Sequence, residues 1–229
     1  MVFNHKEREI GSYIGRLLRE NFGKGPGSVY ATVAYPFITI YIKDFITPME
    51  QRLLDQGDNI AYVQKIRDML METLIPEIKI YIKMRLGVEI KEFYYDWNLH
   101  TSSGMFVAVT PENHTSLSAF YQNQENVHHE IISMSEEAQK TPGKICSYLL
   151  NPRTLLIIRK KILIRIEMEL ISLGYNETLT IAKRRLEKKL LHSHKENLEI
   201  YLGARVENFF VAWNFEEDKS GIVIILQPI

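Results

Sequence analysis

Eight basic residues in the second half of the chain form the largest group whose types and spacing could do chemistry. Three of them follow a predicted strand and five lie on one predicted helix: Arg159, Lys160, Lys161, Lys183, Arg184, Arg185, Lys188 and Lys189. The buried stripe of that helix is predicted at Leu179, Ala182, Leu186 and Leu190. The charges are therefore expected on the opposite face, where they would suit an acidic protein surface, nucleic acid or anionic lipid. An ordinary solvated helix face is the alternative.

A glycine-rich loop in the first half is the second candidate, and its residues are Lys24, Gly25, Gly27 and Ser28. Successive backbone amides near glycines can cradle an anion. A nucleotide-binding P-loop, however, follows a strand and opens a helix, whereas this segment follows a predicted helix and leads into a strand. The sequence therefore favours a structural helix stop, with anion binding as the alternative.

Histidine pairs are the remaining candidates for chemistry. His128 and His129 would point about 100° apart on a helix and could not hold one metal ion together. His192 and His194 would converge on one ion only in an extended segment, and the single cysteine, Cys146, excludes an intrachain disulfide and a multi-cysteine metal site. We predict no metal site, no cofactor and no catalytic residues, and we lean against an enzyme. An active site assembled between the two halves is the alternative.

Composition is typical of a globular protein, but the charges are unevenly distributed. The chain has 229 residues, with 28 basic and 28 acidic side chains. Residues 141–195 contain 12 basic and 4 acidic residues, a net +8, whereas 25–79 contain 5 and 7, a net −2. The amino-terminal residues are charged, and no segment has the roughly 20 apolar residues that span a bilayer. We therefore expect a cytoplasmic protein without a transmembrane segment.

The two halves of the chain repeat one pattern. Five residues of the first half, Phe93, Trp97, Asn98, Gly104 and Pro111, recur as Phe209, Trp213, Asn214, Gly221 and Pro228. Two similar units in one chain are expected to share one fold. We predict a first repeat over 1–112, a linker over 113–126 and a second, divergent repeat over 127–229.

The elements of each repeat follow from periodicity and breakers. In the first half they are a helix over 9–21, strands over 29–33 and 37–42, a helix from Thr47, a longer helix, and strands over 88–97 and 105–109. Thr47-Pro48-Met49-Glu50 is a capping box with proline at the first helical position. The buried stripe of the longer helix is predicted at Val63, Ile66, Leu70, Leu74, Ile78 and Tyr81. The implied fold is α+β: two tandem αββααββ repeats, each with helices packed on an antiparallel sheet.

These features resemble the MpsC-like family of bacterial proteins. The similarity rests on Gly23-Lys24-Gly25-Pro26, the extended run over 28–42, the Thr47 cap and the aromatic hairpin, and it covers 5–112. Residues 124–229 resemble a second copy, which has Leu163-Ile164 in place of the Thr-Pro cap. The resemblance implies a soluble accessory protein of bacterial membrane systems for cation translocation and inorganic-carbon uptake, with no established catalytic residues.

We therefore predict a non-enzymatic cytosolic accessory or regulatory binding protein, peripheral at the inner face of the membrane. Its expected partner is a protein, such as a membrane-transport component, and the basic residues of the second repeat would make the contact. A nucleic-acid or anionic-ligand binding protein is the alternative. The pseudo-dimeric chain leaves both a monomer and a dimer open.

Overall fold

The computed structural model describes residues 2–57, 59–111 and 120–228. Contacts divide the chain into two compact units, Met1–Ser116 (unit 1) and Leu117–Ile229 (unit 2). Unit 1 contains α1 (Val2–Phe22), β1 (Ser28–Ala34), β2 (Phe37–Lys43), α2 (Pro48–Asp55), α3 (Ile60–Leu86), β3 (Glu92–Asn98) and β4 (Ser103–Val109). Unit 2 contains α4 (Gln124–Ala138), β5 (Lys144–Asn151), β6 (Thr154–Lys160), α5 (Arg165–Ser172), α6 (Asn176–Ser193), α7 (Lys195–Leu202), β7 (Ala204–Asn214) and β8 (Lys219–Pro228). The predicted α+β fold with two tandem repeats is confirmed.

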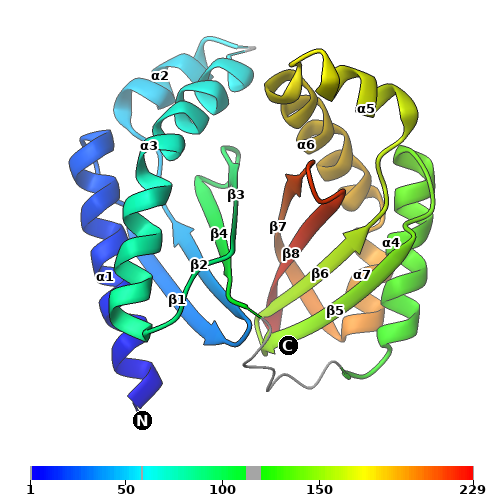
Figure 1. Ribbon diagram of the computed structural model, residues 1–229, viewed down its shortest axis with the longest axis horizontal. Helices are drawn as coiled ribbons and strands as arrows, with labels where there is room; N and C mark the ends of the chain where they lie inside the picture. Colours follow the sequence, from blue (N-terminus) through cyan, green and yellow to red (C-terminus); the bar gives the residue numbers. More distant parts are fainter. Residues whose placement is uncertain (1, 58, 112–119, 229) are drawn as a thin grey trace. The chain divides into compact units, whose positions relative to one another are not determined.

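Each unit is a four-stranded antiparallel sheet with its long helices on one face (Figure 1). The strand order is β1-β2-β4-β3 in unit 1 and β5-β6-β8-β7 in unit 2. Both orders place the second and fourth strands of the unit at the centre of its sheet. The shared order shows that the two halves have one topology, as their common sequence pattern predicts.

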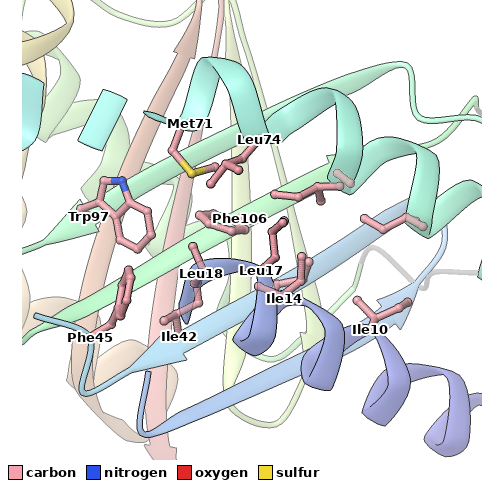
Figure 2. Packing of buried hydrophobic residues seen from close by; sticks show 14 of the residues in the cluster. Ile10, Ile14, Leu17, Leu18, Ile42, Phe45, Met71, Leu74, Trp97 and Phe106 are labelled. Carbon is pink, nitrogen blue, oxygen red and sulfur yellow. The ribbon is translucent and has the colours of Figure 1, made fainter. Parts of the chain in front are cut away.

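The core of unit 1 forms where two helical stripes meet alternate residues of the central strands. Ile10, Ile14 and Leu17 of α1 recur at helical spacing and are buried. Figure 2 shows them packed in one cluster with Ile42 and Phe106 of the sheet and with Met71 and Leu74 of α3. Unit 2 builds its core in the same way. Its contributing residues include Val127 and Ile131 of α4, Leu191 of α6, Leu198 of α7, and Leu155 and Ile224 of the sheet.

Two boundaries differ from the prediction. Helix α4 begins at Gln124, so residues 124–126 of the expected linker are helical, while its residues 113–119 lie outside the described part. The long helix of unit 2 is divided at His194 into α6 and α7, whereas α3 runs on through Pro76. The imidazole of His194 lies between two carboxylates of α4, with Nδ1 2.6 Å from Glu130 and Nε2 2.9 Å from Glu137. These contacts connect the helix junction to α4.

The closing hairpins correct one part of the repeat alignment. Trp97 pairs with Gly104 across β3 and β4, whereas Trp213 pairs with Ser220 across β7 and β8. Ser220, and not Gly221, therefore takes the place of Gly104. A Cβ atom added at Gly104 would lie 2.3 Å from two ring carbons of Trp97, whereas one at Gly221 would meet nothing closer than 3.8 Å. Glycine is thus required at position 104 and not at position 221, because the indole ring of Trp97 covers Gly104.

The Gly104→Ala substitution is expected to destabilise the protein by about 1–3 kcal/mol, because the buried Trp97 ring must shift to admit the methyl group. The matched control is Gly221→Ala, which is expected to change stability by less than about 0.5 kcal/mol. Denaturant unfolding of both variants measures the difference. Equal losses would show that the Trp97 ring does not set the requirement.

Candidate functional site

A buried ion pair joins the start of α2 to α3 in unit 1. The guanidinium of Arg67 donates two hydrogen bonds to the Glu50 carboxylate, from Nε at 2.7 Å and from Nη2 at 2.8 Å. Both side chains are at least nine-tenths buried. Glu50 also accepts a bond from the Thr47 amide at 2.8 Å, which completes the capping box predicted for this helix. One carboxylate therefore caps a helix and neutralises a buried cation.

The aromatic side chains around Arg67 complete its environment. The Arg67 Cζ atom lies 4.6 Å from the ring centroid of Trp97 and 4.8 Å from that of Phe45. A guanidinium over an aromatic face is attracted by the ring quadrupole. Burial alone would raise the pKa of the Glu50 carboxyl, but the hydrogen bonds and charge of Arg67, with the bonds to Thr47, outweigh it and lower that pKa. The Glu50 carboxylate is therefore ionised at neutral pH.

Unit 2 keeps the same arrangement with different side chains. Lys183 of α6 takes the place of Arg67 and donates to the Glu167 carboxylate at 2.5 Å. Glu167 also accepts from the Ile164 amide at 3.0 Å, so the glutamate half of the capping box is retained although threonine is absent. The Lys183 Nζ atom lies 3.8 Å from the ring centroid of Trp213. Both tryptophans thus face a cation from the helix that follows the short one.

Unit 2 has a second buried ion pair, at positions that are apolar in unit 1. Arg159 of β6 donates to the Glu187 carboxylate at 2.5 Å and to Ser220 Oγ at 2.9 Å. By sheet register Arg159 takes the position of Ile42, and along the helix Glu187 takes that of Met71. Desolvation lowers the pKa of the nearby Lys183 ammonium, and the carboxylates oppose that shift. Two apolar positions of unit 1 have therefore become a charged pair.

These contacts show that three of the eight residues predicted for the basic face are buried. Arg159, Lys183 and Arg184 are 0%, 4% and 4% exposed, so they belong to the interior and not to a solvent-facing surface. The predicted stripe is displaced because the buried face of α6 carries charges, while Leu186 is 44% exposed. The other five predicted residues reach solvent. They are Lys160, Lys161, Arg185, Lys188 and Lys189, called the basic surface below.

The basic surface distinguishes unit 2 from unit 1. Residues 160–189 contain eight basic and four acidic residues, a difference of +4, whereas the equivalent residues 43–73 contain four and six, a difference of −2. Within these two segments the buried charges cancel, since Glu50 and Arg67 are buried in 43–73, and two glutamates (Glu167, Glu187) and two cations (Lys183, Arg184) are buried in 160–189. The differences of +4 and −2 therefore belong to the surfaces.

The glycine-rich loop of unit 1 uses its polar groups internally. Lys24 Nζ donates to the Ile46 carbonyl at 2.9 Å, and the Gly27 amide donates to the Lys43 carbonyl at 3.0 Å. A Cβ atom added at Gly25 would lie 2.7 Å from Nε of Arg19. These contacts support a structural role for the loop. Anion binding by Lys24, Gly25, Gly27 and Ser28 stays a prediction that they do not favour.

A serine–histidine contact is the feature closest to a catalytic pair. His128 Nε2 lies 2.7 Å from Ser147 Oγ, which Tyr121 OH also approaches at 2.9 Å. Burial lowers the pKa of His128 and keeps the imidazole neutral. Ser147 is 0% exposed, however, so no substrate reaches its hydroxyl. Across the described ranges, no group of three or more His, Cys, Asp or Glu side chains could hold a metal ion.

Sequence reasoning assigned Glu50 to the capping box alone and missed Arg67, Glu167 and Glu187 as members of buried ion pairs. Their signal was present: Arg67 follows Val63 by four residues and precedes Met71 by four, so it interrupts an apolar series at helical spacing. The glutamate at the third position of each short helix was the second signal. A charge within an apolar stripe together with a nearby carboxylate predicts a buried pair.

Comparison with protein families gives two matches to one model, described as the Na+-translocating membrane potential-generating system (MpsC), over residues 4–112 and 122–228. The chain belongs to the MpsC family. The two matched MpsC segments coincide with the two units, which accounts for their shared topology. Neither the curated proteins nor the solved structures include a match.

The MpsC description concerns a membrane system, and the helices can be compared with that setting. Within the part of the chain that the structure describes, no helix combines the length and the apolar composition needed to cross a bilayer. The longest helix, α3, has 27 residues but carries charges along its length.

Proposed function

We propose that this MpsC-family chain is a non-enzymatic accessory or regulatory protein that binds a protein component of a bacterial membrane cation-transport system. The basic surface of unit 2 makes the contact. The observation that carries the proposal is the difference in surface charge between the two units, +4 against −2 over equivalent segments. Two units with the same buried pair and opposite surface charge support a division of roles, in which one unit has acquired a binding surface.

The proposed contact follows from the chemistry of the basic surface. Lysine and arginine on an exposed helix attract an acidic protein surface and raise the rate of encounter. Lys160, Arg185 and Lys189 are exposed and lie outside the buried ion pairs, so they are free to be changed without unfolding the protein. The family description names a membrane potential-generating system, which supports a membrane component as the partner, and a peripheral, cytoplasmic location is part of the proposal.

Charge reversal tests the proposal. The variant Lys160→Glu/Arg185→Glu/Lys189→Glu is expected to capture its partner from detergent-solubilised native membranes at least tenfold less well than the wild type, as read by quantitative mass spectrometry. The matched control reverses three exposed cations of unit 1, Arg8, Arg52 and Lys65, and is expected to capture normally. Equal capture by all three proteins would refute the role of the basic surface.

Nucleic-acid binding is the alternative use of the basic surface. It predicts affinity for DNA or RNA that falls steeply as salt rises, because phosphate contacts release counterions. Titration of the wild type and of the unit 2 charge-reversal variant at low salt separates the two functions. Binding that is present in the wild type and lost in the variant would favour the nucleic-acid function.

A further inference from the structure

The short helix α5 buries a charged side chain and exposes apolar ones, although Leu170 and Ile171 are half-buried and Arg165 and Glu169 also reach solvent. Its buried residue is the charged Glu167, which pairs with Lys183, whereas apolar side chains face solvent. Ile166 is 61% exposed and Leu173, at the end of the helix, is 68% exposed. A surface helix of a water-soluble protein normally places apolar residues inward and charges outward. The exposed apolar side chains of α5 therefore indicate that this surface contacts an apolar partner.

The turn from α5 to α6 extends this apolar surface. Tyr175 follows Gly174 in the turn and is 54% exposed, and Met168 on α5 is 46% exposed. Figure 1 shows α5 and α6 joined as a helical hairpin at one end of unit 2. Side chains at the end of such a hairpin can insert into a membrane surface without any movement of the sheet or the core.

The exposed charges of residues 160–189 are mainly positive, although Glu169 and Glu177 are exposed in the same segment. Arg165 begins α5, Lys161 precedes it, and Arg185 and Lys189 lie on the exposed side of α6. Apolar and aromatic side chains accompanied by lysine and arginine are the combination that binds the interface of an anionic membrane. The net +4 of this segment complements anionic headgroups, whereas a nearly neutral surface would not discriminate between lipids.

We propose that the α5–α6 hairpin of unit 2 docks on an anionic lipid surface. Ile166, Leu173 and Tyr175 enter the boundary between headgroups and acyl chains, and Arg165 and Arg185 contact the lipid phosphates. The inference rests on the proposed function only in placing unit 2 beside a membrane. It adds a direct lipid contact that requires no protein partner.

Unit 1 provides the internal comparison. Its α2–α3 hairpin also exposes apolar side chains, since Met49 is 63% and Tyr62 is 69% exposed, and the buried residue of α2 is the charged Glu50. The equivalent segment, however, has a net charge of −2. Anionic headgroups repel such a surface, so the lipid contact is assigned to unit 2.

Vesicle co-sedimentation of the full chain tests the proposal. The wild type is expected to bind vesicles of equal parts phosphatidylglycerol and phosphatidylcholine at low salt and not to bind phosphatidylcholine alone. The variant Arg165→Gln/Arg185→Gln/Lys189→Gln is expected to lower the partition coefficient on the order of 100-fold, since each cation near an anionic surface contributes about fivefold. The variant Ile166→Ser/Leu173→Ser is expected to lower it about tenfold.

The control is Met49→Ser/Tyr62→Ser in unit 1, which is expected to bind like the wild type. Failure of the wild type to bind anionic vesicles, or full binding by Ile166→Ser/Leu173→Ser, would overturn the proposal. Loss of binding in the control would also overturn it. Because the vesicles contain no protein, this outcome is independent of partner capture. Vesicle binding without charge-dependent capture would refute only the proposed function.

Discussion

The Arg67→Met variant is expected to lose about 3–5 kcal/mol of unfolding free energy, measured by denaturant unfolding at neutral pH. The reason is that Glu50, which is 4% exposed, would keep its charge without the guanidinium that neutralises it. Such a loss is a large fraction of the roughly 5–15 kcal/mol that stabilises a typical domain. The double variant Glu50→Gln/Arg67→Met is expected to recover part of the loss, because the unpaired charge is gone.

Two further measurements specify the origin of this effect. Lys65→Met, at an exposed position of the same helix, should change stability by less than about 0.5 kcal/mol. The lowered pKa of Glu50 contributes stability that is present above the ordinary glutamate pKa of 4.5 and is lost as pH falls through the lower folded value. Glu50→Gln should therefore show a smaller loss on acidification below pH 4.5. A Glu50→Gln protein with the acid sensitivity of the wild type would contradict the assignment.

The Arg159→Ile variant is expected to lose a similar amount, about 3–5 kcal/mol, because Glu187 would remain buried without the guanidinium that bonds it, with Lys183 Nζ at 4.0 Å as the cation left beside it. Isoleucine is the residue that unit 1 has at this position, and methionine is its equivalent of Glu187. The double variant Arg159→Ile/Glu187→Met is therefore expected to approach or exceed wild-type stability, since apolar replacement of a whole buried pair is often neutral or favourable.

A double-mutant cycle with Glu187→Met measures the coupling between the two side chains. Coupling energies between contacting residues usually lie between about 0.5 and 3 kcal/mol, and a strong value is expected for this pair. If the two single losses simply add in the double variant, the pair contributes nothing beyond its separate side chains. The proposed equivalence of the two units at this position would then be wrong.

The local elements of the fold could be predicted from sequence because their signals are local. The Thr47 capping box, the alternating strands and the repeated Trp97 and Trp213 hairpins all lie within a few residues of the features they specify. The pairing of strands that are far apart in sequence, such as β2 with β4, has no such signal and had to come from the structure.

The predicted buried faces of α3 and α6 are confirmed at Val63, Leu74, Ile78 and Leu179 and are about one residue out of place at the other positions. Apolar residues were expected inside, so Ile66 and Leu186 were assigned to the core, yet they are 42% and 44% exposed. The buried positions are held instead by Arg67 in one unit and by Lys183 and Glu187 in the other. Hydrophobic periodicity cannot locate a face that is partly charged, because a partner from another element supplies the compensation. The exposed apolar side chains of the α5–α6 hairpin were missed because the residue that α5 buries is the charged Glu167.

The glutamate shared by a helix start and a buried cation also bears on how the duplicated gene could evolve. Changing Glu50 or Glu167 removes a helix cap and an ion-pair partner in one step, so neither residue can drift gradually. The cation opposite is less restricted, and it is arginine in one unit and lysine in the other. The glutamate is therefore fixed, whereas its cation can be arginine or lysine. The surfaces of the two repeats can then diverge while both repeats keep the buried ion pair that their fold requires.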